Sequence, residues 1–91
     1  MTPYRNPIRI PDLQAGDQPI EVGVWLVEEG QFVSEGDRIV ELMFPGLVFV
    51  LSSEYSGTLV HRVKHEGAPV HSGDLIGWID SNTEQQGEDL E

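Results

Sequence analysis

The chain has 91 residues and a formal net charge of -11 at pH 7, from 16 acidic residues against 5 lysines and arginines. That length allows one domain at most. The charge argues against a broad nucleic-acid or anionic-lipid surface, because both need clustered basic residues, and it suits solubility and attraction to a basic partner. The chain has no cysteine, which excludes disulfides, thiolate chemistry and thiol metal sites.

Membrane and export signals are also missing from the sequence. No apolar run approaches the roughly 20 residues that a membrane-spanning helix needs. The first ten residues lack the apolar stretch of a secretory signal. We therefore expect a cytoplasmic protein that makes no membrane contact.

Short apolar runs closed by glycine turns dominate the sequence, and no window sustains helical spacing. This pattern predicts an all-β domain. Alternation predicts that Ile20, Val22, Val24 and Leu26 share one face of a strand. In chain order, the predicted strands are residues 7–10, 20–27, 38–44, 47–52, 57–64 and 75–80.

The strands define the predicted domain, residues 7–80, preceded by an N-terminal arm, residues 1–6. Residues 81–91 contain one apolar side chain, Leu90, among polar and acidic residues. Such a composition cannot bury enough apolar surface to fold, and it predicts a disordered acidic tail.

A hairpin turn is predicted at Pro45-Gly46, inside the stretch "ELMFPGLVFV". Proline at the second turn position and glycine at the third are typical of a type II turn, because glycine accepts the positive φ required there. The flanking residues are unusually apolar for an exposed turn.

An internal repeat relates residues 28–39 to residues 65–76 without a gap, at a constant offset of 37. The matched pairs are Glu29/Glu66, Gly30/Gly67, Val33/Val70, Gly36/Gly73, Asp37/Asp74 and Ile39/Ile76. The first glycine permits a positive φ, the valine enters the core, and the aspartate caps a tight turn before the next strand. Two such units predict two β halves related by a pseudo-twofold axis, packed as a small sandwich or flattened barrel.

The segments "PIRIPDL", "WLVEEGQFVSEGDRIVEL" and "EYSGTLVHRVKHEGAPVHSGDLIGWI" resemble the biotinyl/lipoyl carrier domains, above all the lipoyl domains of 2-oxo acid dehydrogenase acyltransferases. The resemblance implies two antiparallel four-stranded sheets in a flattened barrel, the single-hybrid motif, with the two chain ends close together. It also implies a cofactor-bearing lysine on an exposed hairpin at the opposite end.

At that hairpin the sequence departs from the family pattern. Counting back from Ser56-Gly57 places the modified lysine at Gly46, where family tips read Asp-Lys-Ala or Met-Lys-Met. Glycine has no side chain to attach lipoate or biotin. The only lysine of the chain, Lys64, lies well past the hairpin. We therefore expect no bound cofactor and no cofactor-binding residue.

The apolar tip, consisting of Met43, Phe44, Pro45, Gly46 and Leu47, has two interpretations. In the first, alternate members of the apolar flank, which is Met43, Phe44, Leu47 and Phe49, point into the barrel, and only a minority are exposed. In the second, the tip is an exposed apolar knob that binds a partner protein or a second copy of the domain, because exposed apolar patches tend to mark interaction sites.

No residue pattern predicts catalysis or metal binding. On one strand, His61 and His65 would lie about 13 Å apart, too far to share one ion. The serines form no nucleophile elbow and no Ser-His-Asp arrangement. We therefore expect no catalytic residue, no metal site and no enzyme activity.

The predicted function is a non-catalytic lipoyl/biotinyl-like module for protein interaction or assembly. An alternative is an accessory or degenerate carrier domain of a 2-oxo acid dehydrogenase or biotin-dependent carboxylase system, with those subunits as partners. A third is a part of a larger transport or envelope assembly, where such barrels also occur.

Overall fold

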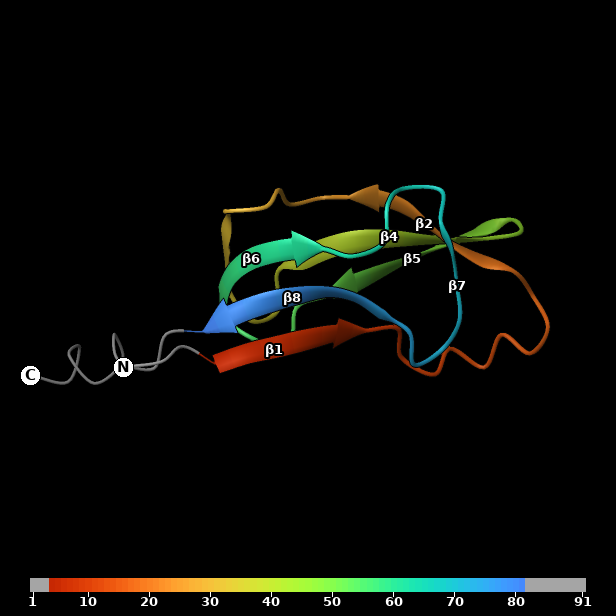
Figure 1. The fold of residues 1–91 in the computed structure, drawn as a ribbon. Helices are drawn as coiled ribbons and strands as arrows, with labels where there is room; N and C mark the ends of the chain where they lie inside the picture. Colours follow the sequence, from red (N-terminus) through yellow and green to blue (C-terminus); the bar gives the residue numbers. More distant parts are fainter. Residues whose placement is uncertain (1–3, 82–91) are drawn as a thin grey trace, which may run out of the picture.

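The computed structural model describes residues 4–81, which form eight strands and no helix (Figure 1). The strands are β1 (Tyr4–Arg9), β2 (Ile20–Trp25), β3 (Phe32–Val33), β4 (Arg38–Phe44), β5 (Leu47–Ser52), β6 (Gly57–Arg62), β7 (Pro69–Val70) and β8 (Leu75–Ser81). They make two antiparallel four-stranded sheets, ordered β1-β8-β6-β3 and β5-β4-β2-β7. The predicted all-β sandwich is confirmed. Over this described range, nothing helical is long and apolar enough to cross a membrane.

The core lies between the two sheets and is built almost entirely from aliphatic side chains of both. Burial of these groups supplies the main driving force for a domain of this size. The buried apolar residues are Ile8, Ile10, Ile20, Val22, Trp25, Val27, Val33, Ile39, Val40, Leu42, Leu59, Val70, Ile76 and Ile79.

The predicted repeat is confirmed as a structural pseudo-twofold. Strands β2, β3 and β4 begin 37 positions before β6, β7 and β8 respectively. The N–H of Gly30 donates to the carbonyl of Leu59, and the N–H of Gly67 donates to that of Val22, both at 2.7 Å. These two glycines have φ values of 92° and 90°, which favour glycine. Each half thus closes its turn against a strand of the other half.

The two Gly-Asp turns are also equivalent. The N–H of Ser34 donates to a carboxylate oxygen of Asp37, and the N–H of His71 donates to that of Asp74, both at 2.8 Å. This capping satisfies a backbone donor within each turn and leads directly into β4 or β8. The role predicted for the aspartates is confirmed.

A β-bulge in each half corrects the predicted alternation. The register of β2 against β4 shifts between Val22 and Val24, and the register of β6 against β8 shifts 37 positions later. The extra residue reverses which side chains face the core. Val24 and Leu26 are therefore exposed, whereas Trp25 and Val27 are buried. The prediction that Val24 and Leu26 share the face of Ile20 is wrong.

The first and last described strands pair along their length, from Tyr4 opposite Ser81 onward. Residues 4–6, assigned to an arm from the sequence, instead belong to β1, and Ser81 ends β8 rather than starting a tail. Residues 1–3 and 82–91 lie outside the described chain. The β4–β5 hairpin projects at the end of the barrel opposite this pair of strand ends (Figure 1).

Candidate interaction site at the hairpin tip

The β4–β5 hairpin is closed by Pro45 and Gly46, with Phe44 paired to Leu47 on either side of them. Gly46 has a φ of 76°, the value that the third position of a type II turn requires. A Cβ at Gly46 would meet nothing within 4 Å, so the position is open to solvent. The predicted turn forms at an exposed apex.

The structure divides the five predicted tip residues into two groups. Leu47 is 60% exposed, Met43 is 37% exposed, and the Pro45-Gly46 turn is exposed as well. Phe44 is half-buried and packs against the core. Phe44 therefore anchors the hairpin to the barrel while the other tip residues face solvent.

A hollow of about 330 Å³ lies beside the tip. It is lined by Pro19, Ile20, Glu21, Met43, Phe44, Pro45 and Pro69. Three proline rings with fixed φ make this a stiff wall, and one carboxylate stands at its side. The hollow suits an apolar side chain with a positive charge next to it, or a long side chain whose apolar stem ends in a positive charge. The sequence did not indicate Pro19 and Pro69, because the loop before β2 and the strand β7 become neighbours of the tip only when the strands assemble in the order β5-β4-β2-β7.

The chain's only lysine lies away from this apex. The backbone N–H of Lys64, in the β6–β7 connection, donates to the carbonyl of Ile76 at 3.3 Å. Its own carbonyl accepts the indole N–H of Trp25 at 2.8 Å. Trp25 ends β2, and Ile20 at the other end of that strand lines the tip hollow. At strand spacing this separates Lys64 from the tip by on the order of 15 Å.

A second hollow, of about 510 Å³, is lined by Trp25, Glu29, His61, Arg62, Lys64, His65 and Glu66. The strand β6 ends at Arg62, so His65 does not continue the strand of His61 as the sequence suggested, and both histidines border one hollow. The Nδ1 atom of His61 lies 3.5 Å from a carboxylate oxygen of Glu29. Within the described chain, no three His, Asp or Glu side chains are grouped to hold a metal ion.

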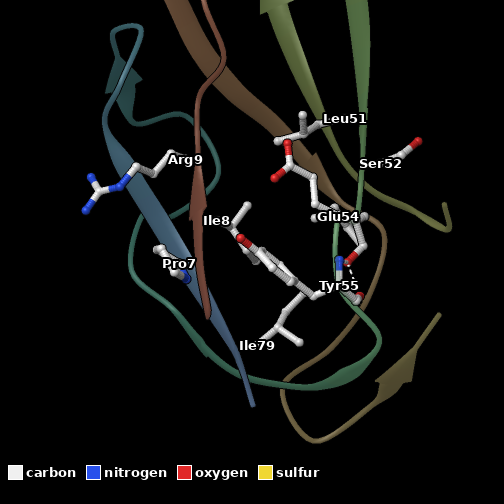
Figure 2. Close-up of a pocket in the computed structure, with 10 residues that line it drawn as sticks. Pro7, Ile8, Arg9, Leu51, Ser52, Glu54, Tyr55 and Ile79 are labelled. Atoms are coloured by element: carbon white, nitrogen blue, oxygen red, sulfur yellow. Dashed lines mark hydrogen bonds between the residues drawn. The ribbon is translucent and has the colours of Figure 1, made fainter. Parts of the chain in front are cut away.

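A third cavity, of about 20 Å³, has room for no more than about one water molecule. Figure 2 shows the ring of Tyr55 beside Ile8 and Ile79 at this point. The hydroxyl of buried Ser53 donates to the carbonyl of Tyr55 and accepts the N–H of the same residue. Ser53 therefore holds a turn in place and is not poised as a nucleophile.

Comparisons with known proteins agree with this architecture. A biotin/lipoyl family model, described as "Biotin-requiring enzyme", matches residues 6–79. The chain is 31% identical over 72 residues to the dihydrolipoyllysine-residue succinyltransferase component of the 2-oxoglutarate dehydrogenase complex of Bacillus subtilis (strain 168). It is 32% identical over 73 residues to the dihydrolipoyllysine-residue acetyltransferase component of the pyruvate dehydrogenase complex of Staphylococcus aureus (strain N315).

These matches cover 79% and 80% of this chain, and 17% of the length of each relative. The similarity is thus to one domain of larger proteins. The family model spans most of the chain, and the two antiparallel sheets have the arrangement that the resemblance implied. The chain belongs to the biotin/lipoyl domain family.

Proposed function

We propose that this domain carries no prosthetic group and acts, without catalysis of its own, as a protein-binding module that uses the β4–β5 hairpin tip. The observation that carries the proposal is the identity of the two apex residues, Pro45 and Gly46. In the resembled domains, the arm is joined by an amide to a lysine amine at the tip. Neither apex residue supplies such an amine.

The remaining lysine does not fit this role either. The backbone of Lys64 is bonded on both sides, to Ile76 and to the indole of Trp25, in a connection away from the apex. An arm attached there would start on the order of 15 Å from the tip. The tip of this chain therefore has the shape of a carrier hairpin without its chemistry.

The surface of the tip supports a binding role. Met43 and Leu47 present apolar area to solvent. Met43 lines the hollow walled by the three prolines, and Leu47 pairs with Phe44, another residue of its lining. Phe44 anchors the hairpin in the core, so little ordering entropy is lost when a partner binds. Glu21 in the hollow and the net charge of -11 favour a partner with apolar and basic groups.

Intact-mass measurement of the chain after co-expression with lipoate and biotin ligases tests the proposal. The expected result is the unmodified mass. An added lipoyl or biotinyl mass would overturn it. If the added mass were lost in Lys64→Arg, the attachment site would be Lys64, and the domain would be a carrier that is modified outside the hairpin tip.

A second candidate function is an accessory domain of a 2-oxo acid dehydrogenase or biotin-dependent carboxylase system. The relatives named above favour the dehydrogenase, since both are acyltransferase components of such complexes. NMR titration of the labelled domain with decarboxylase and acyltransferase components tests this function. Binding at Met43 and Leu47 would support it, and unchanged spectra with every component would exclude it.

A further inference from the structure

The strand β5 is an uncovered edge that lacks the usual protection. The other outer strands are β1, β3 and β7. Strands β3 and β7 are two residues long, and β1 carries Arg5, Pro7 and Arg9. Short length, charge and proline are the common devices that keep sheet edges from pairing with other chains. Strand β5 reads LVFVLS over six residues and has none of them.

The pseudo-twofold supplies an internal control for this strand, because β1 occupies the equivalent place in the other sheet. Val48 pairs with Met43 in the same relation in which Arg5 pairs with Asp80. The Nε atom of Arg5 lies 2.9 Å from a carboxylate oxygen of Asp80, and this hydrogen bond raises the pKa of Arg5. The fold therefore accepts a charged pair at this position. In the sheet that contains β4 and β5, the equivalent pair, Met43 and Val48, is apolar and exposed.

From Val48 to Val50, both faces of β5 lack cover, whereas Leu51 near the end of the strand packs against the core. Val48 and Val50 lie on the outer face of the sheet and are 46% and 37% exposed. Phe49 pairs with buried Leu42, so it lies on the core side, yet it is 38% exposed. The core side is open at Phe49 because no strand lies beyond β5. A further strand along this edge would cover side chains on both faces and bond its free backbone groups.

We propose that two copies of this chain pair through β5, antiparallel across a twofold axis, joining their β5-β4-β2-β7 sheets into one continuous sheet. This pairing goes beyond the proposed function, since it uses the sheet edge and holds whether or not the tip binds another protein. Antiparallel self-pairing is isologous, because the same surface is used by both copies.

Charge favours a second copy over a foreign peptide as the occupant. Residues 47–53 carry no charge, although the chain as a whole carries -11. Self-pairing needs this neutrality, since a charge near the twofold axis would face its own like charge. A basic strand would be attracted by acidic residues, and β5 offers none. The two acidic bodies repel each other, so pairing should strengthen as salt screens them over about 10 Å at 0.1 M.

Sedimentation of the full chain over a range of concentrations, at about 50 mM and about 500 mM salt, tests the proposal. The parent should form dimers, and the dimers should be tighter at the higher salt. Val48→Lys should weaken dimerisation by about tenfold or more, a change of about 1.4 kcal/mol. Val24→Lys is the matched control: Val24 is 43% exposed on the same sheet face, but on an inner strand. It should change the dissociation constant by less than about threefold.

A parent that stays monomeric at every concentration and salt would overturn the proposal. So would a dimer that Val24→Lys breaks as readily as Val48→Lys, since that result indicates packing through the face. Intermolecular nuclear Overhauser effects between β5 strands in a mixed-labelled dimer would support it. The ligase mass measurement reports on the tip alone, so the two proposals fail independently.

Discussion

Glu29 and Glu66 lie 37 positions apart, and each carboxylate accepts a backbone N–H from the end of a strand in the other half. Glu66 accepts from Trp25 at 3.0 Å, and Glu29 accepts from Arg62 at 2.8 Å. The repeat is thus held together by a reciprocal exchange of hydrogen bonds. The glutamate that precedes each turn glycine has a structural task that its exposed position conceals.

Replacement of Glu66 by alanine should destabilise the domain by about 1–2 kcal/mol, because the N–H of Trp25 is part-buried and would lose its acceptor. Glu29→Ala should cost less, since the N–H of Arg62 is exposed and water can replace the carboxylate. Urea unfolding measures both. Glu66→Gln, which keeps an acceptor, should recover most of the loss. Equal losses in the two alanine variants would contradict this assignment.

The two apolar side chains that pair beside the hairpin turn should differ in how strongly a charge at their position destabilises the domain. Phe44→Asp should destabilise the domain by about 2–4 kcal/mol, because Phe44 packs against the core. Leu47→Asp should change stability by less than about 0.5 kcal/mol, because Leu47 is exposed. Thermal and urea unfolding give both values. A large loss in Leu47→Asp would show that the tip is packed after all.

Two glycines separate steric from conformational cost. A Cβ at Gly57 would clash with the carbonyl oxygen of Asp80, so Gly57→Ala must move β6 from β8. We expect a loss of about 3 kcal/mol or failure to fold. A Cβ at Gly46 meets nothing, so Gly46→Ala should cost only the positive φ, about 1 kcal/mol. A larger loss in Gly46→Ala than in Gly57→Ala would contradict the close pairing of β6 with β8.

The Arg5–Asp80 ion pair should contribute a nearly constant stability between about pH 6 and about pH 9. Arg5 has a folded-state pKa raised by its hydrogen bond to Asp80. Its contribution is therefore complete below the unfolded-state pKa and lost only as the pH rises through the higher folded-state value, well above this window. Arg5→Gln should lower the free energy of unfolding slightly, and by the same amount at about pH 6 and at about pH 9. A loss that grows between them would indicate another titrating group.

The sequence predicted the architecture well, because the features that define it are local. Gly30 and Gly67 mark the first turn of each unit, and Asp37 and Asp74 cap the second, so the repeat could be read as turn chemistry. Strands β4 and β5 were predicted with the bounds that the structure shows. The hairpin turn followed from Pro45-Gly46 alone.

Features that depend on how strands meet could not be read in the same way. The bulge beside Gly23 reversed the alternation of β2, since one extra residue changes the phase of every side chain after it. Strands β3 and β7 are too short to leave a pattern. The exposure of Val48 and Phe49 follows from the place of β5 at a sheet edge, which is a property of the sheet order and not of the strand.

The position of the apex can be tested by restoring what the family tip provides. The double variant Pro45→Asp/Gly46→Lys places an amine where no neighbour lies within 4 Å of the Cβ. We expect it to gain a lipoyl or biotinyl group in cells that express the ligases. Val48→Lys, with its amine on the strand β5, should gain none. An unmodified double variant would argue that the attachment register does not fall on Gly46.

Intact mass, compared for the parent chain and this double variant from the same ligase-expressing cells, is the most direct measurement. If the fold is that of a carrier domain and its apex lacks an amine, the parent should keep its unmodified mass, and the double variant should gain a lipoyl or biotinyl group. A parent that itself carries a lipoyl or biotinyl mass would contradict the central claim.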